Sequence, residues 1–164
     1  IRDSMAGIGT MTYYDPESGS FGALGHGITD VDTAQLMSLG SGSIMETTVK
    51  AVKKGEKGDP GELKGDFSVQ RDVGTVTVNS DGGIFGTVSD SSFPAPGEPV
   101  AVASPEEVTT GRAVIRSTIS GEEIREYEAE IVKVCRDEDT TRNLLLRITD
   151  PELLRATGGI VQGM

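Results

Sequence analysis

The sequence predicts an all-β fold of short strands, with one short helix near residues 150–157. Glycine occurs 22 times and proline 7 times in 164 residues, which disfavours long helices. Segments that alternate apolar and polar residues recur along the chain, and turn residues separate them. No segment has a helical pattern long enough to connect two parallel strands, so a βαβ fold is disfavoured. Two small packed β-barrels or a sandwich remain as candidates.

The first half of the chain predicts two hairpins and one further strand. Residues 5–14 and 21–25 flank a turn that begins with Asp15-Pro16, and this order is typical of a hairpin. Residues 44–52 are rich in Thr and Val and predict a strand. The alternating residues 73–78 and the apolar residues 84–88 flank Asp81-Gly82-Gly83 and predict the second hairpin.

Residues 53–65 are charged and glycine-rich, and they predict an exposed loop or a pair of turns. Gly55, Gly58 and Gly61 fall at every third position, as they do in collagen. Three triplets are too few for a triple helix, which needs a long Gly-X-Y repeat from three chains. Residues 89–99 carry Pro94, Pro96 and Pro99 and predict a linker. We therefore expect two groups of strands, over residues 1–93 and 94–164, which form two β-barrel subdomains or a sandwich.

The second half predicts three strands and the helix. Residues 108–120 and 122–134 read as a hairpin, and in its second strand Tyr127, Ala129 and Ile131 share one face, opposite Glu126, Glu128 and Glu130. Residues 142–149 contain three consecutive leucines and predict a strand with a fuller core. The helix is expected to begin after Asp150 as N-cap, with Pro151 in its first turn, and to end at Gly158.

Composition excludes several functions. The formal net charge of −11 opposes binding to nucleic acid and to anionic membranes, because both require clustered Lys and Arg. A chain with one histidine, His26, and one cysteine, Cys135, cannot build a His/Cys zinc site, an iron–sulfur cluster or an internal disulfide. No run of 18 apolar residues is present, so no membrane span is expected. We expect no metal and no cofactor.

His26 is the first candidate for catalysis. It lies between Gly25 and Gly27, so no bulky neighbour shields its ring, and the backbone can turn sharply there. A histidine with a pKa near neutrality is the commonest general base in enzymes. The alternative is that this lone histidine is structural.

The C-terminal residues 158–164 form the second candidate. Two glycines, an apolar pair and Gly163 predict a backbone with unusual torsions. Consecutive N–H groups in such a turn can form an oxyanion hole. The alternative is a flexible tail, which is common for a glycine-rich end.

Several blocks of the sequence together resemble the SpoIVB peptidase family of endospore-forming bacteria. The match is collinear over essentially the whole chain, which makes it more specific than any single motif. It is carried by Ala6-Gly7-Ile8-Gly9-Thr10, Phe21-Gly22-Ala23-Leu24-Gly25-His26 with Ile28 and Asp30, Gly55 to Gly61, Gly83-Ile84-Phe85-Gly86-Thr87, Ile148-Thr149-Asp150-Pro151 and Gly158-Gly159-Ile160-Val161-Gln162-Gly163-Met164. The resemblance implies a trypsin-like double β-barrel and serine peptidase activity.

The resemblance also implies roles for single residues. His26 would be the general base, and in the family a Gly-Met pair runs into a segment whose first serine is the nucleophile. We therefore expect that serine directly after Met164, with the second barrel of this chain truncated before it. The chain alone would then be inactive. Gly163 would donate to the oxyanion, and Met164 would lie beside it. Asp150 would be the acid that orients His26, and Asp30 and Asp32 remain rivals for that role.

Further expectations concern the biological setting. The resemblance implies a membrane-tethered parent protein in the extracytoplasmic space between the spore membranes, with an upstream PDZ module. It implies self-cleavage and cleavage of a regulatory protein that restrains a membrane metalloprotease. The alternative is a non-catalytic β-barrel module that binds peptides or a partner chain. A spore-coat component is a second alternative, for which the sequence shows no repeat.

Overall fold

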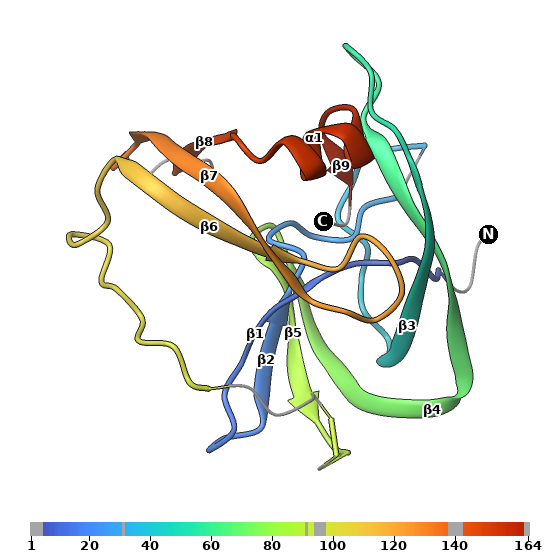
Figure 1. Cartoon of the computed structure of the whole chain (residues 1–164). Helices are drawn as coiled ribbons and strands as arrows, with labels where there is room; N and C mark the ends of the chain where they lie inside the picture. Colours follow the sequence, from blue (N-terminus) through green and yellow to red (C-terminus); the bar gives the residue numbers. More distant parts are fainter. Residues whose placement is uncertain (1–4, 31, 91, 94–97, 138–142, 163–164) are drawn as a thin grey trace.

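The chain folds into two β-sheets and one short helix (Figure 1). This computed structural model describes residues 5–30, 32–90, 92–93, 98–137 and 143–162. Half of the chain lies in strands and 5% in the helix, which confirms the all-β prediction. The architecture is compatible with a trypsin-like fold, although neither sheet closes into a barrel within the described residues.

The larger sheet has six strands and the smaller has three. The first contains β1 (Met11–Tyr14), β2 (Ser20–Ala23), β5 (Gly83–Val88), β4 (Gly61–Ser80) and β3 (Gly42–Lys53) in that order, and β9 (Val161–Gln162) pairs with β4. The second contains β6 (Gly111–Ser117), β7 (Arg125–Val134) and β8 (Leu144–Ile148). The helix α1 (Pro151–Thr157) follows β8. All pairs are antiparallel except β4 with β9.

Strand β4 is the longest strand of the larger sheet and pairs with three others. It has 20 residues and pairs with β3, β5 and β9, so the expectation of uniformly short strands is wrong here. Register shifts interrupt its ladders with β3 and β5, and such irregularities bend a strand. The prediction of an exposed loop over residues 53–65 is also wrong in its second half. Strand β4 begins at Gly61, and Leu63 is buried.

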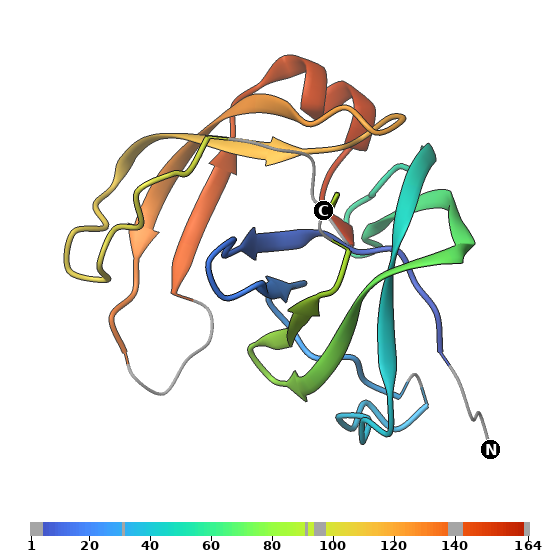
Figure 2. The same ribbon diagram turned by 90° about the horizontal axis from the view of Figure 1, so that it is seen from below.

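Two apolar clusters form the core of the larger sheet. The first gathers Phe21, Ala23, Val76 and Ile84 from β2, β4 and β5. The second gathers Val49, Leu63 and Val161 from β3, β4 and β9. Strand β9 thus contributes to the core of this sheet although it lies more than 70 residues after β5. Figure 2 shows the two sheets side by side from a second direction.

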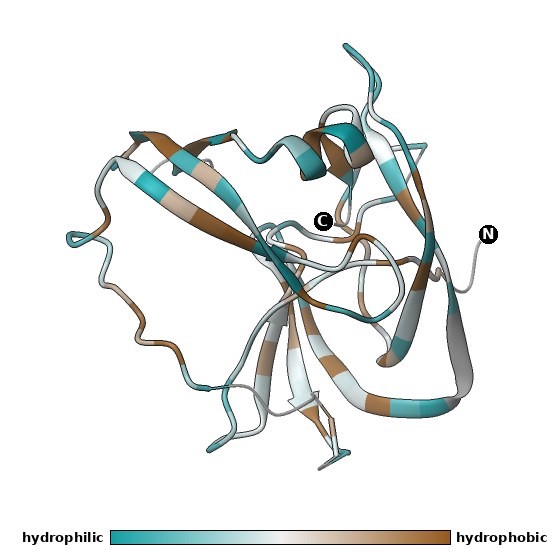
Figure 3. Cartoon of the chain, in the orientation of Figure 1, coloured by the Kyte–Doolittle hydropathy of each residue, from teal (hydrophilic) through white to brown (hydrophobic). Residues whose placement is uncertain are grey.

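The smaller sheet confirms the predicted alternation of strand β7. Tyr127 and Ala129 are buried, whereas Glu126 and Glu128 on the opposite face are exposed. Hydropathy alternates along β6 and β7 in Figure 3. On the exposed face arginines of β6 and β8 pair with glutamates of β7: Arg112 with Glu128, Arg116 with Glu126, and Arg147 with Glu130. Exposed pairs of this kind each add little stability, so Tyr127 and Ala129 hold this sheet in place.

The predicted fuller core of residues 142–149 is wrong. Leu144, Leu145 and Leu146 of β8 are 46%, 55% and 45% exposed. The physical reason is position: β8 is the outer strand of a three-stranded sheet and pairs only with β7. Consecutive leucines point to alternate faces of a strand, so an edge strand cannot bury all three.

The predicted linker begins at a cluster of polar contacts. The Nη2 atom of Arg71 lies 2.7 Å from Oδ2 of Asp90 and 2.7 Å from Oγ of Ser92. Hydrogen bonds from Ser92 and the Arg71 guanidinium lower the pKa of Asp90 to about 2. Residues 94–97 lie outside the described part of the chain. The division into subdomains at residue 93 stays a prediction.

Beyond the linker, the second half of the chain rests on the first at the turn between β6 and β7. The Val49 amide donates to Gly121 O at 2.9 Å, and the Gly121 amide donates to Val49 O at 2.8 Å. The Thr48 hydroxyl donates to Glu122 at 2.8 Å. This contact joins the β6–β7 turn of the smaller sheet to β3 of the larger one. After β8 and α1, the chain returns to the larger sheet as β9.

Candidate active site

His26 lies in a sharp turn that follows β2, over residues 24–27, called the His26 turn below. Leu24 and Gly25 both have positive φ, at 73° and 72°. This region suits glycine but is unfavourable for leucine, so the turn stores strain. The His26 side chain is exposed at this turn. The His26 ring is therefore accessible, as the sequence predicts, and its catalytic role stays a prediction.

The end of the β4–β5 hairpin packs closely against the His26 turn. A Cβ added to Gly27 would lie 2.6 Å from Ser80 O, and one added to Gly83 would lie 2.7 Å from Ala23 O. Both distances are shorter than real Cβ contacts, so these positions require glycine. The hairpin end therefore fixes where the His26 turn can lie.

Asn79, in the same hairpin, anchors the segment that follows His26. Its Oδ1 accepts from the Ile28 amide at 2.8 Å, and its Nδ2 donates to the carbonyls of Ile28 and Met37, both at 2.9 Å. Sequence reasoning missed this residue. Its partners lie 51 and 42 positions away, and the sequence offers only a polar residue at the end of an alternating strand.

We expect Asn79→Ala to lower the free energy of unfolding by about 1–3 kcal/mol. The Ile28 amide and the Met37 carbonyl lose the Asn79 side chain, and the Ile28 carbonyl keeps only its bond from the Met37 amide. We also expect lower peptidase activity, because the segment after His26 loosens. Chemical denaturation and a cleavage assay on the full-length protein measure both. Asp81→Ala, an exposed change in the same hairpin, is the control. Full activity in Asn79→Ala would show that this anchor does not position His26.

The His26 ring contacts the backbone that follows it. Its Nδ1 lies 3.0 Å from the carbonyl oxygen of Gly27. A carbonyl oxygen can only accept, so this contact is a hydrogen bond in the tautomer whose Nδ1 carries the proton, and in that tautomer Nε2 presents a lone pair. A general base that acts through Nε2 needs this tautomer.

Asp150 caps the helix α1, as the sequence predicts. Its Oδ1 accepts from the amides of Glu152 at 2.8 Å and Leu153 at 3.0 Å, and Gly158 closes the helix with φ 68°. The Leu153 amide, together with that of Glu152, lowers the pKa of Asp150 below its usual value. Both helix bonds use Oδ1, which leaves Oδ2 for another donor. Within the described residues no hydrogen bond joins Asp150 to His26.

The two rival acids lie in the loop after β2. The Oδ1 atom of Asp30 accepts from the amides of Asp32 and Thr33 and from the Thr33 hydroxyl, at 2.9–3.1 Å. Asp32 is exposed. These hydrogen bonds show that the Asp30 side chain stabilises a local turn.

The C-terminal segment forms strand β9 rather than a free tail. Val161 is 7% exposed and packs in the second core cluster. The Gly61 amide donates to Ile160 O at 2.7 Å. Gly163 and Met164, the predicted oxyanion residues, lie outside the described part of the chain. Their roles stay predictions, but the residues directly before them are held in the core.

Comparison with protein families decides the class of this site. The family model of SpoIVB peptidase S55 matches residues 1–164, which is the whole chain. The chain belongs to the SpoIVB peptidase family. It is thus a serine peptidase domain of a sporulation family, and its substrates are proteins. No curated protein and no solved structure matches it.

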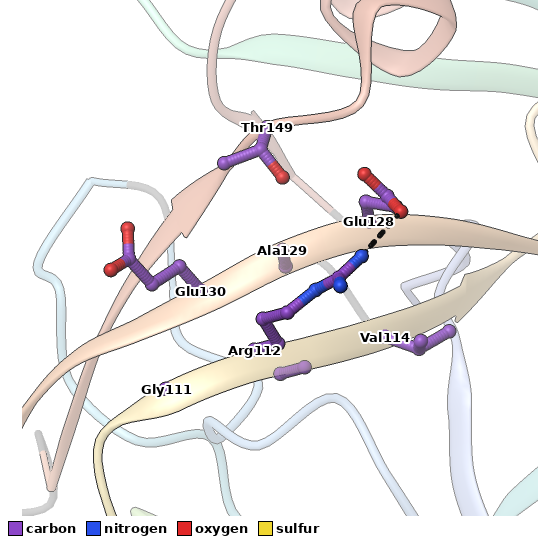
Figure 4. A pocket seen from close by; sticks show the side chains of 8 residues that line it. Gly111, Arg112, Val114, Glu128, Ala129, Glu130 and Thr149 are labelled. Carbon is purple, nitrogen blue, oxygen red and sulfur yellow. Dashed lines mark hydrogen bonds and ion pairs between the residues drawn. The ribbon is translucent and has the colours of Figure 1, made fainter.

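Three further findings concern the described residues of this SpoIVB peptidase domain. A pocket of about 550 Å³ lies on the smaller sheet, lined by β6 and β7, and the Arg112–Glu128 pair lies across it (Figure 4). Neither His26 nor Asp150 lines this pocket, so it is not the predicted catalytic centre. The described residues contain no helix long and apolar enough to span a bilayer. They also contain no group of three or more His, Cys, Asp or Glu that could hold a metal ion.

Proposed function

We propose that this chain is the catalytic domain of a sporulation endopeptidase that uses His26 as its general base. The observation that carries the proposal is the His26 turn, read together with the family match. The turn exposes the ring, and the Gly27 carbonyl keeps the Nδ1 proton in place and leaves Nε2 free. The nucleophile in this proposal is the serine that follows the Gly-Met pair in the family pattern, here Gly163-Met164.

The reaction begins when His26 Nε2 accepts the proton of the serine hydroxyl while its oxygen attacks the peptide carbonyl. A C–O bond forms, and the carbonyl becomes a tetrahedral oxyanion. The oxyanion then collapses, the C–N bond breaks, and His26 returns the proton to the leaving amine. Water repeats the sequence on the acyl-enzyme and frees the acid product and the serine.

Asp150 is the acid that orients His26 in this proposal. Its carboxylate is ionised, because the helix amides lower its pKa, and Oδ2 has no partner in the helix. A carboxylate on Nδ1 stabilises the imidazolium that forms during attack. In the described structure Nδ1 contacts Gly27 O, so contact with Asp150 requires the ring or the α1 end to shift. Asp30 and Asp32 remain the alternatives.

Gly163 supplies an amide to the oxyanion, and Met164 places the serine beside it. Backbone amides are suited to this task because they are fixed before the charge develops. Strand β9 supports the proposal, since its two residues immediately precede Gly163 and are paired to β4.

The proposed biological role follows the family. The full-length protein is tethered to a membrane, carries a PDZ module before this domain and acts outside the cytoplasm, between the spore membranes. It cleaves itself and a protein that restrains a membrane metalloprotease. We expect such a partner to present a basic surface, because a domain with a net charge of −11 associates faster with positive charge.

A cleavage assay with class-selective inhibitors tests the proposed function. The full-length protein is incubated with an unstructured protein substrate. We expect a fluorophosphonate to block cleavage, and EDTA and iodoacetamide to leave it unchanged. Blockage by EDTA would assign the reaction to a metallopeptidase instead. Absence of cleavage by the folded full-length protein would favour the alternative, a module that only binds peptides or a partner.

A further inference from the structure

Two glycines of residues 53–65, Gly55 and Gly61, contact the C-terminal segment, which the collagen-like spacing does not reveal. Residues 54–60, called the hairpin tip below, connect β3 to β4. The Gly55 amide donates to Thr157 O at 2.8 Å, and the Gly61 amide donates to Ile160 O at 2.7 Å. Figure 1 shows this tip beside α1 and β9. The tip and the first residue of β4 thus hold the chain at the end of α1 and at the start of β9.

Close approach explains why two of these positions are glycine. A Cβ on Gly55 would lie 2.4 Å from Ile160 O and 3.2 Å from Ile160 N. A Cβ on Gly61 would lie 2.3 Å from Lys53 O and 2.6 Å from the Gly55 amide nitrogen. All of these neighbours are backbone atoms, which cannot move aside as a flexible side chain can.

Gly58 has a different reason to be glycine. Its φ is 88°, and a Cβ there would meet nothing within 4 Å. It serves the turn between Glu56 and Asp59, whose amides and carbonyls bond to each other at 2.8 and 3.1 Å. The glycines at every third position therefore have two functions. Gly55 and Gly61 allow close contact with backbone atoms, and Gly58 allows the turn.

Strand β9 depends on these contacts. It has two residues, pairs only with β4 and buries only Val161. The neighbouring Ile160 side chain is 81% exposed and adds no anchor. Residues 157–162 are thus held in place by two kinds of contact. These are the hydrogen bonds from Gly55 and Gly61 and the pairing of β9 with β4.

We infer that the hairpin tip positions the oxyanion-binding segment, with Gly55 and Gly61 as positioning residues. This inference rests on the proposed function, because it takes Gly163 as the oxyanion donor. A displacement of the catalytic groups by about 1 Å is enough to lower activity about 10²-fold. Ile160 precedes Gly163 by three positions in the sequence, so we expect a shift at Ile160 to lower the activity that depends on this donor.

Alanine variants of the full-length protein test the inference. We expect Gly55→Ala to lower kcat about 10²-fold and to change KM less than about threefold, because an oxyanion donor acts in the transition state. Gly58→Ala is the matched control: it strains the same tip without touching residues 157–162 and should keep kcat within about threefold. Equal losses of kcat in the two variants would overturn the inference, as would full kcat in Gly55→Ala.

Amide hydrogen exchange in the unaltered protein provides a test that needs no variant. We expect the Gly55 and Gly61 amides to exchange as slowly as the paired amides of β4. Exchange as fast as at Gly58 would overturn the inference even if Gly55→Ala does not fold. A different result would refute the proposed function. That result is an unaltered protein that does not cleave, and it does not depend on the exchange rates at the hairpin tip.

Discussion

Replacing His26 with alanine is expected to lower kcat/KM of the full-length protein by about 10³-fold or more. The physical reason is that His26 takes the serine proton in the proposed mechanism, and residues 1–164 contain no second histidine to replace it. The thermal unfolding midpoint should stay close to that of the unaltered protein, because the side chain is exposed and outside both apolar clusters. Cleavage kinetics and a thermal scan measure the two quantities.

Thr29→Ala, a change at an exposed position nearby, is the control for the His26 change. Asp32→Ala is less suitable, because Asp32 is a candidate for the orienting acid. Thr29→Ala should leave kcat/KM within about threefold. A His26→Ala protein that keeps its activity would remove His26 from the mechanism. One that unfolds would show that the ring has a structural role in the turn.

Replacing Asp150 with asparagine is expected to separate its two roles. Asparagine caps a helix about as well as aspartate, so Asp150→Asn keeps the cap of α1. It removes the carboxylate, and loss of the orienting acid lowers kcat by as much as about 10⁴-fold in triad enzymes. Asp150→Ala loses both, and should also unfold at a lower temperature. Equal kcat in Asp150→Asn and the unaltered protein would restrict Asp150 to capping and direct attention to Asp30 and Asp32.

The pH dependence of stability checks the same carboxylate independently. Its pKa in the folded protein is lowered, chiefly by the Leu153 amide. The stabilisation is therefore complete above the unfolded pKa of about 3.9 and is lost as the pH falls through the lower folded value. The difference in unfolding free energy between the unaltered protein and Asp150→Asn should be constant above about pH 5 and shrink below it. A difference that does not change with pH would contradict the ionised cap.

The local features of the fold were predictable because each depends on neighbours in sequence. Alternation identified the buried face of β7, with Tyr127 and Ala129. Capping chemistry identified α1, since each cap bonds to nearby residues. The Asp150 side chain accepts from the amides of Glu152 and Leu153, and the Gly158 amide donates to Leu154 O. The exposure of His26 followed from its flanking glycines. In these cases the residue and its partner lie within about four positions of each other.

The features that were missed depend on partners far away in sequence. Asn79 contacts Ile28 and Met37, and no local pattern connects them. Gly55 and Gly61 contact residues about 100 positions later, so a collagen-like spacing concealed contacts with the end of α1 and with the residue before β9. The three leucines of β8 were expected in the core, because hydrophobicity alone does not reveal that a strand lies at an edge.

The central claim is that His26 activates a serine placed directly after the β9 segment. Labelling of the full-length protein with a fluorophosphonate, followed by mass mapping of the modified peptide, tests this claim most directly. The account predicts one adduct, on the serine that follows Met164, and loss of labelling in His26→Ala. An adduct on another residue, or equal labelling in His26→Ala, would contradict it.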